Sequence, residues 1–237
     1  MTPAPPQTLD LAKLKEAAQL VKKRAWEDPH VYLFGDQYQR GLVKTLDEHD
    51  FDNPVKPLPD RPPLRALTDW WMEEQQLIIA KSRQLMISWG CLSLINWECW
   101  HPGRLWGVTC KRFDDADGLL GRIYHIYQNV PKGIRPKVEK KKGVLTVSTD
   151  AGPPSTIMAL SQDSDAPRSR TFSGLYIDEA AFTDNLSWLY ASAKPTVQGG
   201  GKVVLTSSPN GVGFFTDLLT DTGRIDIEEV VKRAGWR

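Results

Sequence analysis

The chain has 237 residues, 41% of them hydrophobic, and can bury a sizeable core as one large domain, alone or with an N-terminal appendage. The formal net charge of +1 excludes a protein that binds nucleic acid through its overall charge, so a DNA contact must come from local basic clusters or from an oligomer that repeats a weak patch. Three cysteines without a C-x-x-C pair, scattered histidines and interrupted apolar stretches exclude a disulfide framework, a zinc site and a membrane span, as expected of a soluble intracellular protein.

Residues 1–63 are expected to form a small N-terminal helical extension and a proline-rich linker. The prolines of Met1–Gln7 indicate a disordered lead. Thr8–Trp26 has apolar residues at helical spacing with lysines between them, which predicts a helix. Three interpretations of it stay open: a docking helix, a helix that faces DNA, and, as the favoured one, the solvated face of a small helical subdomain. Asp47–Pro63 contains five prolines and is interpreted as a linker or wrapping loop.

Helices and strands alternate from residue 64 onward. Helices are predicted at Leu64–Gln76, at Ser88–His101, and from Asp114 and Asp115, which are expected to cap the helix, to Asn129. Pro131–Lys142 is predicted to be a basic loop. Strands are predicted at Leu77–Ala80, Arg104–Cys110, Val144–Ser148, Thr156–Leu160, Leu175–Ile177 and Val203–Thr206. The alternation predicts an α/β fold in which helices flank a mostly parallel sheet and the ligand binds at the carboxyl ends of the strands.

The stretch Leu77–Gly90, LIIAKSRQLMISWG, predicts a strand, a polar turn and the start of a helix. Such a turn receives the free N–H groups and the positive end of the helix dipole, which favours a bound phosphate. The common phosphate-binding pattern is G-x-x-x-x-G-K-[ST]. Here Lys81 occupies the first glycine position, Met86 the second and Ile87 the lysine position, whereas Ser88 retains the terminal hydroxyl. The common pattern alone would therefore reject this site.

KSRQLMIS resembles the deviant phosphate loop of tailed-phage large terminase subunits, the ATP-driven motors that pump DNA into procapsids. In some members of that family the lysine lies at the first position of the loop, as Lys81 does here. Three further stretches resemble family elements in the same order, and together the matches span roughly residues 77–215: FDDADGLLGRIYHIYQNVP at 113–131, PRSRTFSGLYIDEAAF at 167–182 and KVVLTSSPNG at 202–211.

The resemblance implies a P-loop NTPase fold of the ASCE, RecA-like type, with the ATPase domain at residues 64–237. The family usually carries a C-terminal RNase H-like nuclease domain, and we expect this chain to lack it. The implied cofactors are ATP and Mg²⁺. The residues expected to bind ATP are Lys81, Ser82, Arg83, Gln84, Leu85, Met86, Ile87, Ser88 and Trp89.

Hydrolysis of ATP requires charge neutralisation, a positioned water and in-line geometry. Ser88 and Asp178 are placed to bind Mg²⁺, and Glu179 is the expected general base that activates the attacking water. Lys81 has a side chain long enough to reach the β- and γ-phosphates. The alternative, a solvated lysine at the end of a strand in a degenerate, non-hydrolysing domain, stays open.

Further roles follow from the resemblance. Arg83 corresponds to the loop arginine of the family, which could either sense the γ-phosphate or pair with a carboxylate of the protein. Arg168 corresponds to an arginine that can reach the site of a neighbouring subunit. Arg170 is the alternative for the second role. The coupling motif falls on Thr206, Ser207 and Ser208, whose hydroxyls could sense the γ-phosphate. Lys140, Lys141 and Lys142 are the densest basic run and the candidate DNA contact, although a solvated face is favoured.

These features predict the ATPase domain of a viral terminase that hydrolyses ATP to translocate double-stranded DNA. The implied partners are double-stranded DNA, the portal protein and procapsid, the small terminase subunit and further copies in a homo-oligomeric ring, in the host cytoplasm and without a membrane. Two alternatives remain: a nucleotide-binding assembly module that does not hydrolyse ATP, and a helicase-like ATPase that remodels DNA.

Overall fold

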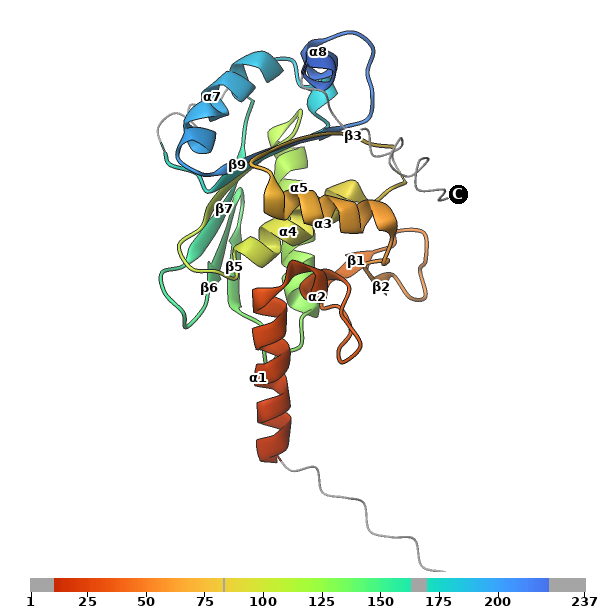
Figure 1. Cartoon of the computed structure of the whole chain (residues 1–237), viewed down its shortest axis with the longest axis vertical. Coiled ribbons are helices and arrows are strands. Elements are labelled where there is room, and N and C mark those ends of the chain that lie inside the picture. The colour runs from red at the N-terminus through yellow and green to blue at the C-terminus, as the bar shows by residue number, and fades with distance from the viewer. Residues whose placement is uncertain (1–10, 83, 163–169, 222–237) are drawn as a thin grey trace, which may run out of the picture.

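A seven-stranded sheet forms the centre of the computed structural model, which describes residues 11–82, 84–162 and 170–221 (Figure 1). The order of its strands is β3-β9-β8-β4-β7-β6-β5. The first five are parallel, and β6 and β5 are antiparallel to their neighbours, so the predicted mostly parallel α/β sheet is confirmed. The strands are β3 (Gln76–Ala80), β4 (Leu105–Thr109), β5 (Lys137–Lys141), β6 (Val144–Ser148), β7 (Ser155–Leu160), β8 (Gly174–Asp178) and β9 (Lys202–Ser207).

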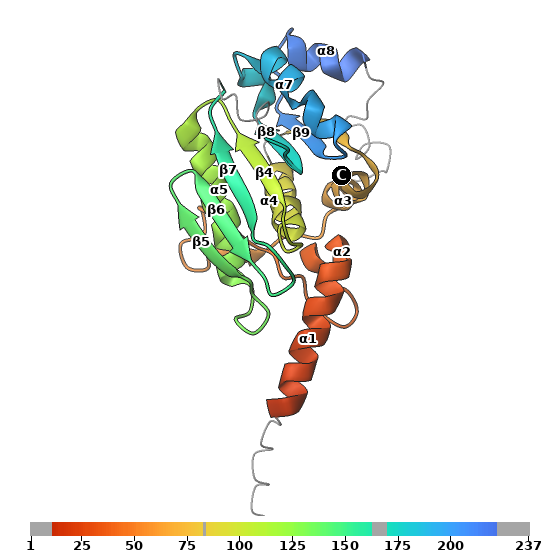
Figure 2. The same cartoon turned by 90° about the vertical axis from the view of Figure 1, so that its left-hand side faces the viewer.

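Helices cover the two faces of this sheet (Figures 1 and 2). One face packs against α3 (Pro62–Glu73), α4 (Ile87–Glu98) and α5 (Phe113–Asn129), and the other against α7 (Leu186–Gln198) and α8 (Phe214–Asp221). Strand β8 is buried at every position because both of its faces are covered: Tyr176 packs on the α3–α5 side, and Leu175 and Ile177 pack on the α7–α8 side.

From residue 11, where the described part begins, the N-terminal region contains more regular structure than its prolines predict; the disordered lead predicted at Met1–Gln7 lies outside the described residues. The predicted helix is present as α1 (Leu11–Glu27), but α2 (Pro29–Leu33), with Asp28 as its cap, was not predicted. The interpretation of 47–63 as a linker is wrong at two points. β2 (Val55–Pro57) pairs antiparallel with β1 (Lys44–Leu46), and α3 begins at Pro62. A three-residue strand is too short to show an alternating pattern, and proline is tolerated in the first turn of a helix.

Three further predictions need correction. Part of the basic loop predicted at Pro131–Lys142 is strand β5. It lies at the edge of the sheet, and one of its faces is exposed to solvent. Asp114 and Asp115 lie in the first turn of α5 rather than at its cap, which is Arg112, and Asp115 accepts two hydrogen bonds from the Arg112 guanidinium. Helix α3 ends at Glu73, and Gln76 already belongs to β3. Helices α7 and α8 and the short 3-10 turn η1 (Ala180–Phe182) were not predicted.

Helix α4 is buried on almost all sides, as its apolar sequence predicts. The three cysteines (Cys91, Cys99 and Cys110) are buried and free. Within the part of the chain that the structure describes, each helix is too short or too polar to cross a bilayer.

The last residue of α4, Glu98, is bound by two tryptophan side chains. The Glu98 carboxylate accepts hydrogen bonds from two indole N–H groups, from Trp71 at 2.7 Å and from Trp106 at 3.1 Å, and the two indole rings stack on one another. Burial raises the pKa of the Glu98 carboxyl, although the two indoles and Lys202 oppose this rise.

The raised pKa makes the stability of the fold depend on pH. The folded state keeps the proton of Glu98 to a higher pH than the unfolded chain does, so the free energy of unfolding falls as the pH rises above about 4.5 and through the raised pKa. Glu98→Gln removes this titration, so its stability relative to wild type should improve with pH over that window by about 1.4 kcal/mol for each unit of the pKa difference. Urea unfolding at several pH values measures it. A constant difference between the two proteins would contradict the titration.

Candidate active site

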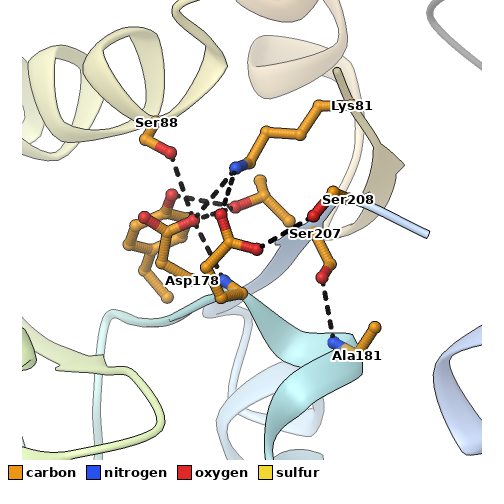
Figure 3. Close-up of polar contacts among 9 residues, drawn as sticks. Lys81, Ser88, Asp178, Ala181, Ser207 and Ser208 are labelled. Carbon is orange, nitrogen blue, oxygen red and sulfur yellow. Dashed lines mark hydrogen bonds and ion pairs between the residues drawn. The ribbon is translucent and has the colours of Figure 1, made fainter. Parts of the chain in front are cut away.

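Three strand ends bring the predicted site residues together (Figure 3). Because β9 lies between β3 and β8, the carboxyl ends of these parallel strands meet at one edge of the sheet. The register pairs Ala80 with Ser207 and Asp178 with Thr206, so the loop after β3 lies beside the ends of the other two strands. The sheet order, rather than any local segment, therefore assembles the site.

Lys81 points into this site. Its side chain is only 6% exposed, and its backbone N–H donates to the Ser207 carbonyl at 2.9 Å, which fixes the start of the loop on β9. Its Nζ lies 2.9 Å from Glu179 Oε1 and 3.6 Å from Asp178 Oδ1. The alternative that Lys81 is a solvated lysine at the end of a strand is therefore wrong.

Asp178 is the centre of a hydrogen-bond network. Its Oδ1 accepts hydrogen bonds from Ser88 Oγ at 3.1 Å, Thr206 Oγ1 at 2.8 Å and the backbone N–H of Glu179 at 3.1 Å. Thr206 Oγ1 also lies 2.9 Å from the Tyr176 hydroxyl, and burial raises the pKa of that hydroxyl well above its ordinary value. The predicted metal pair, Ser88 and Asp178, is thus in direct contact.

The donor set of this site fits Mg²⁺. Hydroxyl and carboxylate oxygens are the ligands that hard cations take, and Mg²⁺ usually combines one or two carboxylates with phosphate and water. The described residues contain no group of three or more His, Cys, Asp or Glu side chains that could hold a metal. Ser88 and Asp178 supply two oxygen ligands of this kind, one hydroxyl and one carboxylate.

Two residues of the site have a left-handed backbone. Met86, with φ of 57°, and Glu179, with φ of 51°, are the two non-glycine residues with positive φ in the described ranges. Such a conformation costs on the order of 1–3 kcal/mol. Met86 occupies the second glycine position of the common phosphate pattern and adopts the backbone that a glycine would adopt there. The loop therefore keeps the glycine-type turn without the glycine.

The other loop residues lie around the start of α4. Met86 offers no side-chain hydrogen bond to cap α4, so the N–H groups of its first turn are suited to an anion. Gln84 is exposed, Ser82 is half-buried and Leu85 packs against the core. The Trp89 ring faces α5, where it contacts Arg122 and His125.

Each residue of the predicted coupling motif contacts the segment that carries the acids. Besides the bond from Thr206 to Asp178, Ser207 Oγ accepts from the backbone N–H of Ala181 at 3.1 Å, and Ser208 Oγ donates to Glu179 Oε2 at 3.4 Å. Sequence reasoning did not identify Tyr176 or the contact of Asn210 with the Ala181 carbonyl at 3.2 Å. Tyr176 precedes Asp178 by two positions and so shares its side of β8, which was the available signal.

Of the three predicted arginines, the structure describes Arg170 alone. Arg83 and Arg168 lie outside the described residues. Arg170 precedes the amino end of β8, whereas the acids lie at its carboxyl end. The Arg170 guanidinium donates to Met158 Sδ at 3.4 Å.

The three candidate DNA-binding lysines belong to the β5–β6 hairpin, at the sheet edge opposite β3. Each has a carboxylate nearby: Lys140 pairs with Asp117 at 3.2 Å, Lys141 with Glu139 at 3.0 Å and Lys142 with Asp114 at 3.9 Å. These partners reduce the net positive charge of the hairpin.

No protein-family model matches the chain. Among the solved structures that are similar to it are three phage large terminases. The ATPase domain of the large terminase of Thermus phage P74-26 is 18% identical with a TM-score of 0.55, over 68% of this chain and 69% of that one. The large terminase of bacteriophage HK97 is 12% identical with a TM-score of 0.56, over 76% of this chain and 40% of that one.

The third is the large terminase of a thermophilic bacteriophage, solved in complex with ADP. It is 15% identical with a TM-score of 0.52, over 64% of this chain and 39% of that one. This chain therefore spans about 40% of the length of the HK97 protein and of the ADP-bound protein. At these identities the likeness shows the fold, so the chain has the fold of phage large terminase ATPase domains, as its sequence predicts.

The hydrogen bonds of Thr206 make a testable contribution to stability. Thr206→Val keeps the shape but leaves Asp178 and Tyr176 without this buried partner, which should lower the free energy of unfolding by about 1–3 kcal/mol. Chemical denaturation measures the loss. Thr206→Ser retains the hydroxyl and should lose less. An unchanged free energy of unfolding in Thr206→Val would show that the hydrogen bonds of Thr206 do not stabilise the fold.

Proposed function

We propose that this chain is the ATPase domain of a viral DNA-packaging terminase, which hydrolyses ATP with Mg²⁺ to translocate double-stranded DNA into a procapsid. The observation that carries the proposal is the convergence of Lys81, Ser88 and the pair Asp178–Glu179 at adjoining strand ends. The shared fold supports it, and so does the ADP found in one of the similar terminases. ATP is the proposed ligand for that reason.

The triphosphate would bind between Lys81 and the first turn of α4. Lys81 is the first residue of the loop, and its ammonium lies within 3.6 Å of the carboxylates of Glu179 and Asp178. A γ-phosphate brings more negative charge than a single carboxylate and would compete for that ammonium. Movement of Lys81 from Glu179 to the phosphate would also leave the carboxylate free to accept a proton.

Ser88 and Asp178 would hold the magnesium ion, which would neutralise charge on the phosphates when bound. Thr206 and the Glu179 amide fix Asp178 Oδ1 from other directions, so the carboxylate is oriented before a nucleotide arrives. Because the carboxylate is already oriented, its reorganisation during the reaction costs little free energy.

Glu179 is the proposed general base. It would accept a proton from a water molecule whose oxygen attacks the γ-phosphorus, while the bond from that phosphorus to the bridging oxygen of ADP breaks. Its left-handed backbone and the contact with Ser208 present the carboxylate at the end of β8. Ser208 connects this carboxylate to β9, a path by which phosphate release could be transmitted.

The remaining roles complete the proposal. Arg83 would contact the γ-phosphate, and Arg168 or Arg170 would act on a neighbouring subunit in a homo-oligomeric ring. Double-stranded DNA, the portal protein and procapsid, and the small terminase subunit are the proposed partners, in the host cytoplasm. Lys140, Lys141 and Lys142 are proposed to contact DNA only if a ring brings several hairpins together, since each lysine already has an acidic partner.

Replacement of the base tests hydrolysis. Glu179→Gln retains size and polarity but cannot take a proton, so the ATPase rate should fall about 10²–10⁴-fold while ATP binding persists. Phosphate release, measured with and without portal and procapsid, gives the rate, and calorimetry gives the affinity. Asp184→Asn, which changes an exposed acid beyond η1, is the matched control. An unchanged rate would remove Glu179 from the mechanism, and binding without turnover in wild type would favour an assembly module.

Replacement of the loop cation tests binding. Lys81→Met removes the charge but keeps an apolar side chain of similar length. The affinity for ATP should fall by at least about tenfold, because one charge-assisted hydrogen bond to the phosphates is lost. Lys111→Met, at an exposed lysine after β4, should leave the affinity unchanged. Equal affinity in wild type and Lys81→Met would show that another cation binds the phosphates.

A further inference from the structure

Helix α1 is attached to the body of the molecule at its carboxyl end. Ala25 is fully buried, and its carbonyl accepts a hydrogen bond from the Trp97 indole of α4 at 3.0 Å. Figures 1 and 2 both show the amino-terminal turns of α1 pointing away from the sheet. Leu14 and Leu11, in those turns, are 47% and 68% exposed.

An apolar stripe runs along the whole of α1. Its members follow alternating steps of three and four residues and so lie on one side of the helix: Leu11, Leu14, Ala18, Val21 and Ala25. The stripe is buried at Ala25, half-buried at Ala18 and Val21, where it packs against the core, and exposed at its amino-terminal end. The apolar stripe of α1 is therefore packed against the core at its carboxyl end and exposed to solvent at its amino end.

Positive charge borders this stripe. In a seven-residue repeat that starts at Leu11, the positions beside the stripe are Lys15 and Lys22 on one side and Ala17 and Arg24 on the other. Arg24 is engaged with Asp36 of the same chain. None of the described residues forms an ion pair with Lys15 or Lys22. Glu16 and Lys23, by contrast, occupy the position of the repeat opposite the stripe.

The exposed leucines of α1 and the lysines beside them favour one class of binding partner over others. In an antiparallel pair, a second copy of α1 would place its border lysines, Lys15 and Lys22, against those of the first copy, which disfavours that pairing. A DNA duplex would satisfy the lysines but would leave Leu11 and Leu14 in water. A helix with its own apolar stripe and acidic borders satisfies both features.

We propose that the amino-terminal turns of α1 dock an acidic amphipathic helix of another protein, in a short two-helix contact that extends the packed seam outward. Leu11 and Leu14 supply the apolar contact, Lys15 lies beside them, and Lys22 continues the positive border one heptad further along α1.

A designed peptide of three heptads, with leucine at the two stripe positions and glutamate at the two border positions, is the probe. Fluorescence anisotropy with the whole chain should show binding, and the same peptide with lysine at the borders should bind at least about tenfold more weakly. Leu14→Gln should weaken binding of the acidic peptide by about tenfold or more, since a leucine is no longer buried. Leu20→Gln, at a leucine 57% exposed outside the stripe, is the matched control and should not.

A charge exchange gives the sharpest result. The double change Lys15→Glu and Lys22→Glu should reverse the preference, so that this variant binds the lysine-bordered peptide better than the acidic one, whereas Lys23→Glu should leave the wild-type preference intact. Four outcomes would overturn the proposal: no peptide binding, equal binding of both peptides, self-association of the wild-type chain that Leu14→Gln abolishes, or binding of a DNA duplex or anionic vesicle at α1 in place of the peptide.

Discussion

The charge balance of this site depends on the ion pair between Lys81 and Glu179. A buried ammonium is costly unless carboxylates neutralise it, and here two acids from another strand lie within 3.6 Å. That contact exists only because β9 inserts between β3 and β8 and aligns their carboxyl ends. The lysine, the acids and the hydroxyls of β9 therefore form one connected network, in which a change in any member alters the charge balance of the others.

Backbone conformation compensates for a loop sequence with little glycine. Met86 holds a left-handed conformation where the common phosphate pattern has glycine, and packing of its side chain against the core offsets part of the cost. Glu179 holds the same conformation at the end of β8. Strain is thus concentrated at the two turns that aim the helix dipole and the carboxylate at the same place, as expected where function requires a fixed geometry.

Part of the fold and of the site is predictable from local sequence patterns. The apolar runs of β3, β8 and β9 and the buried helix α4 follow from sequence, because buried strands and helices leave strong local patterns. The pairing of Ser88 with Asp178 was expected from the resemblance of the loop and the acidic motif to those of terminases. The contact between Thr206 and Asp178 does not, because it depends on which strand lies between two others. Strand β5 was missed because an edge strand rich in lysine has the composition of a loop. The left-handed Met86 was missed because methionine carries no signal for it.

A crystal structure with Mg²⁺ and a non-hydrolysable ATP analogue would show which cation contacts the γ-phosphate. The expected result is that Lys81 Nζ leaves Glu179 and donates to a γ-phosphate oxygen, while Ser88 and Asp178 lie on the same magnesium ion. A bound nucleotide whose phosphates contact a different cation, with Lys81 still paired to Glu179, would contradict it.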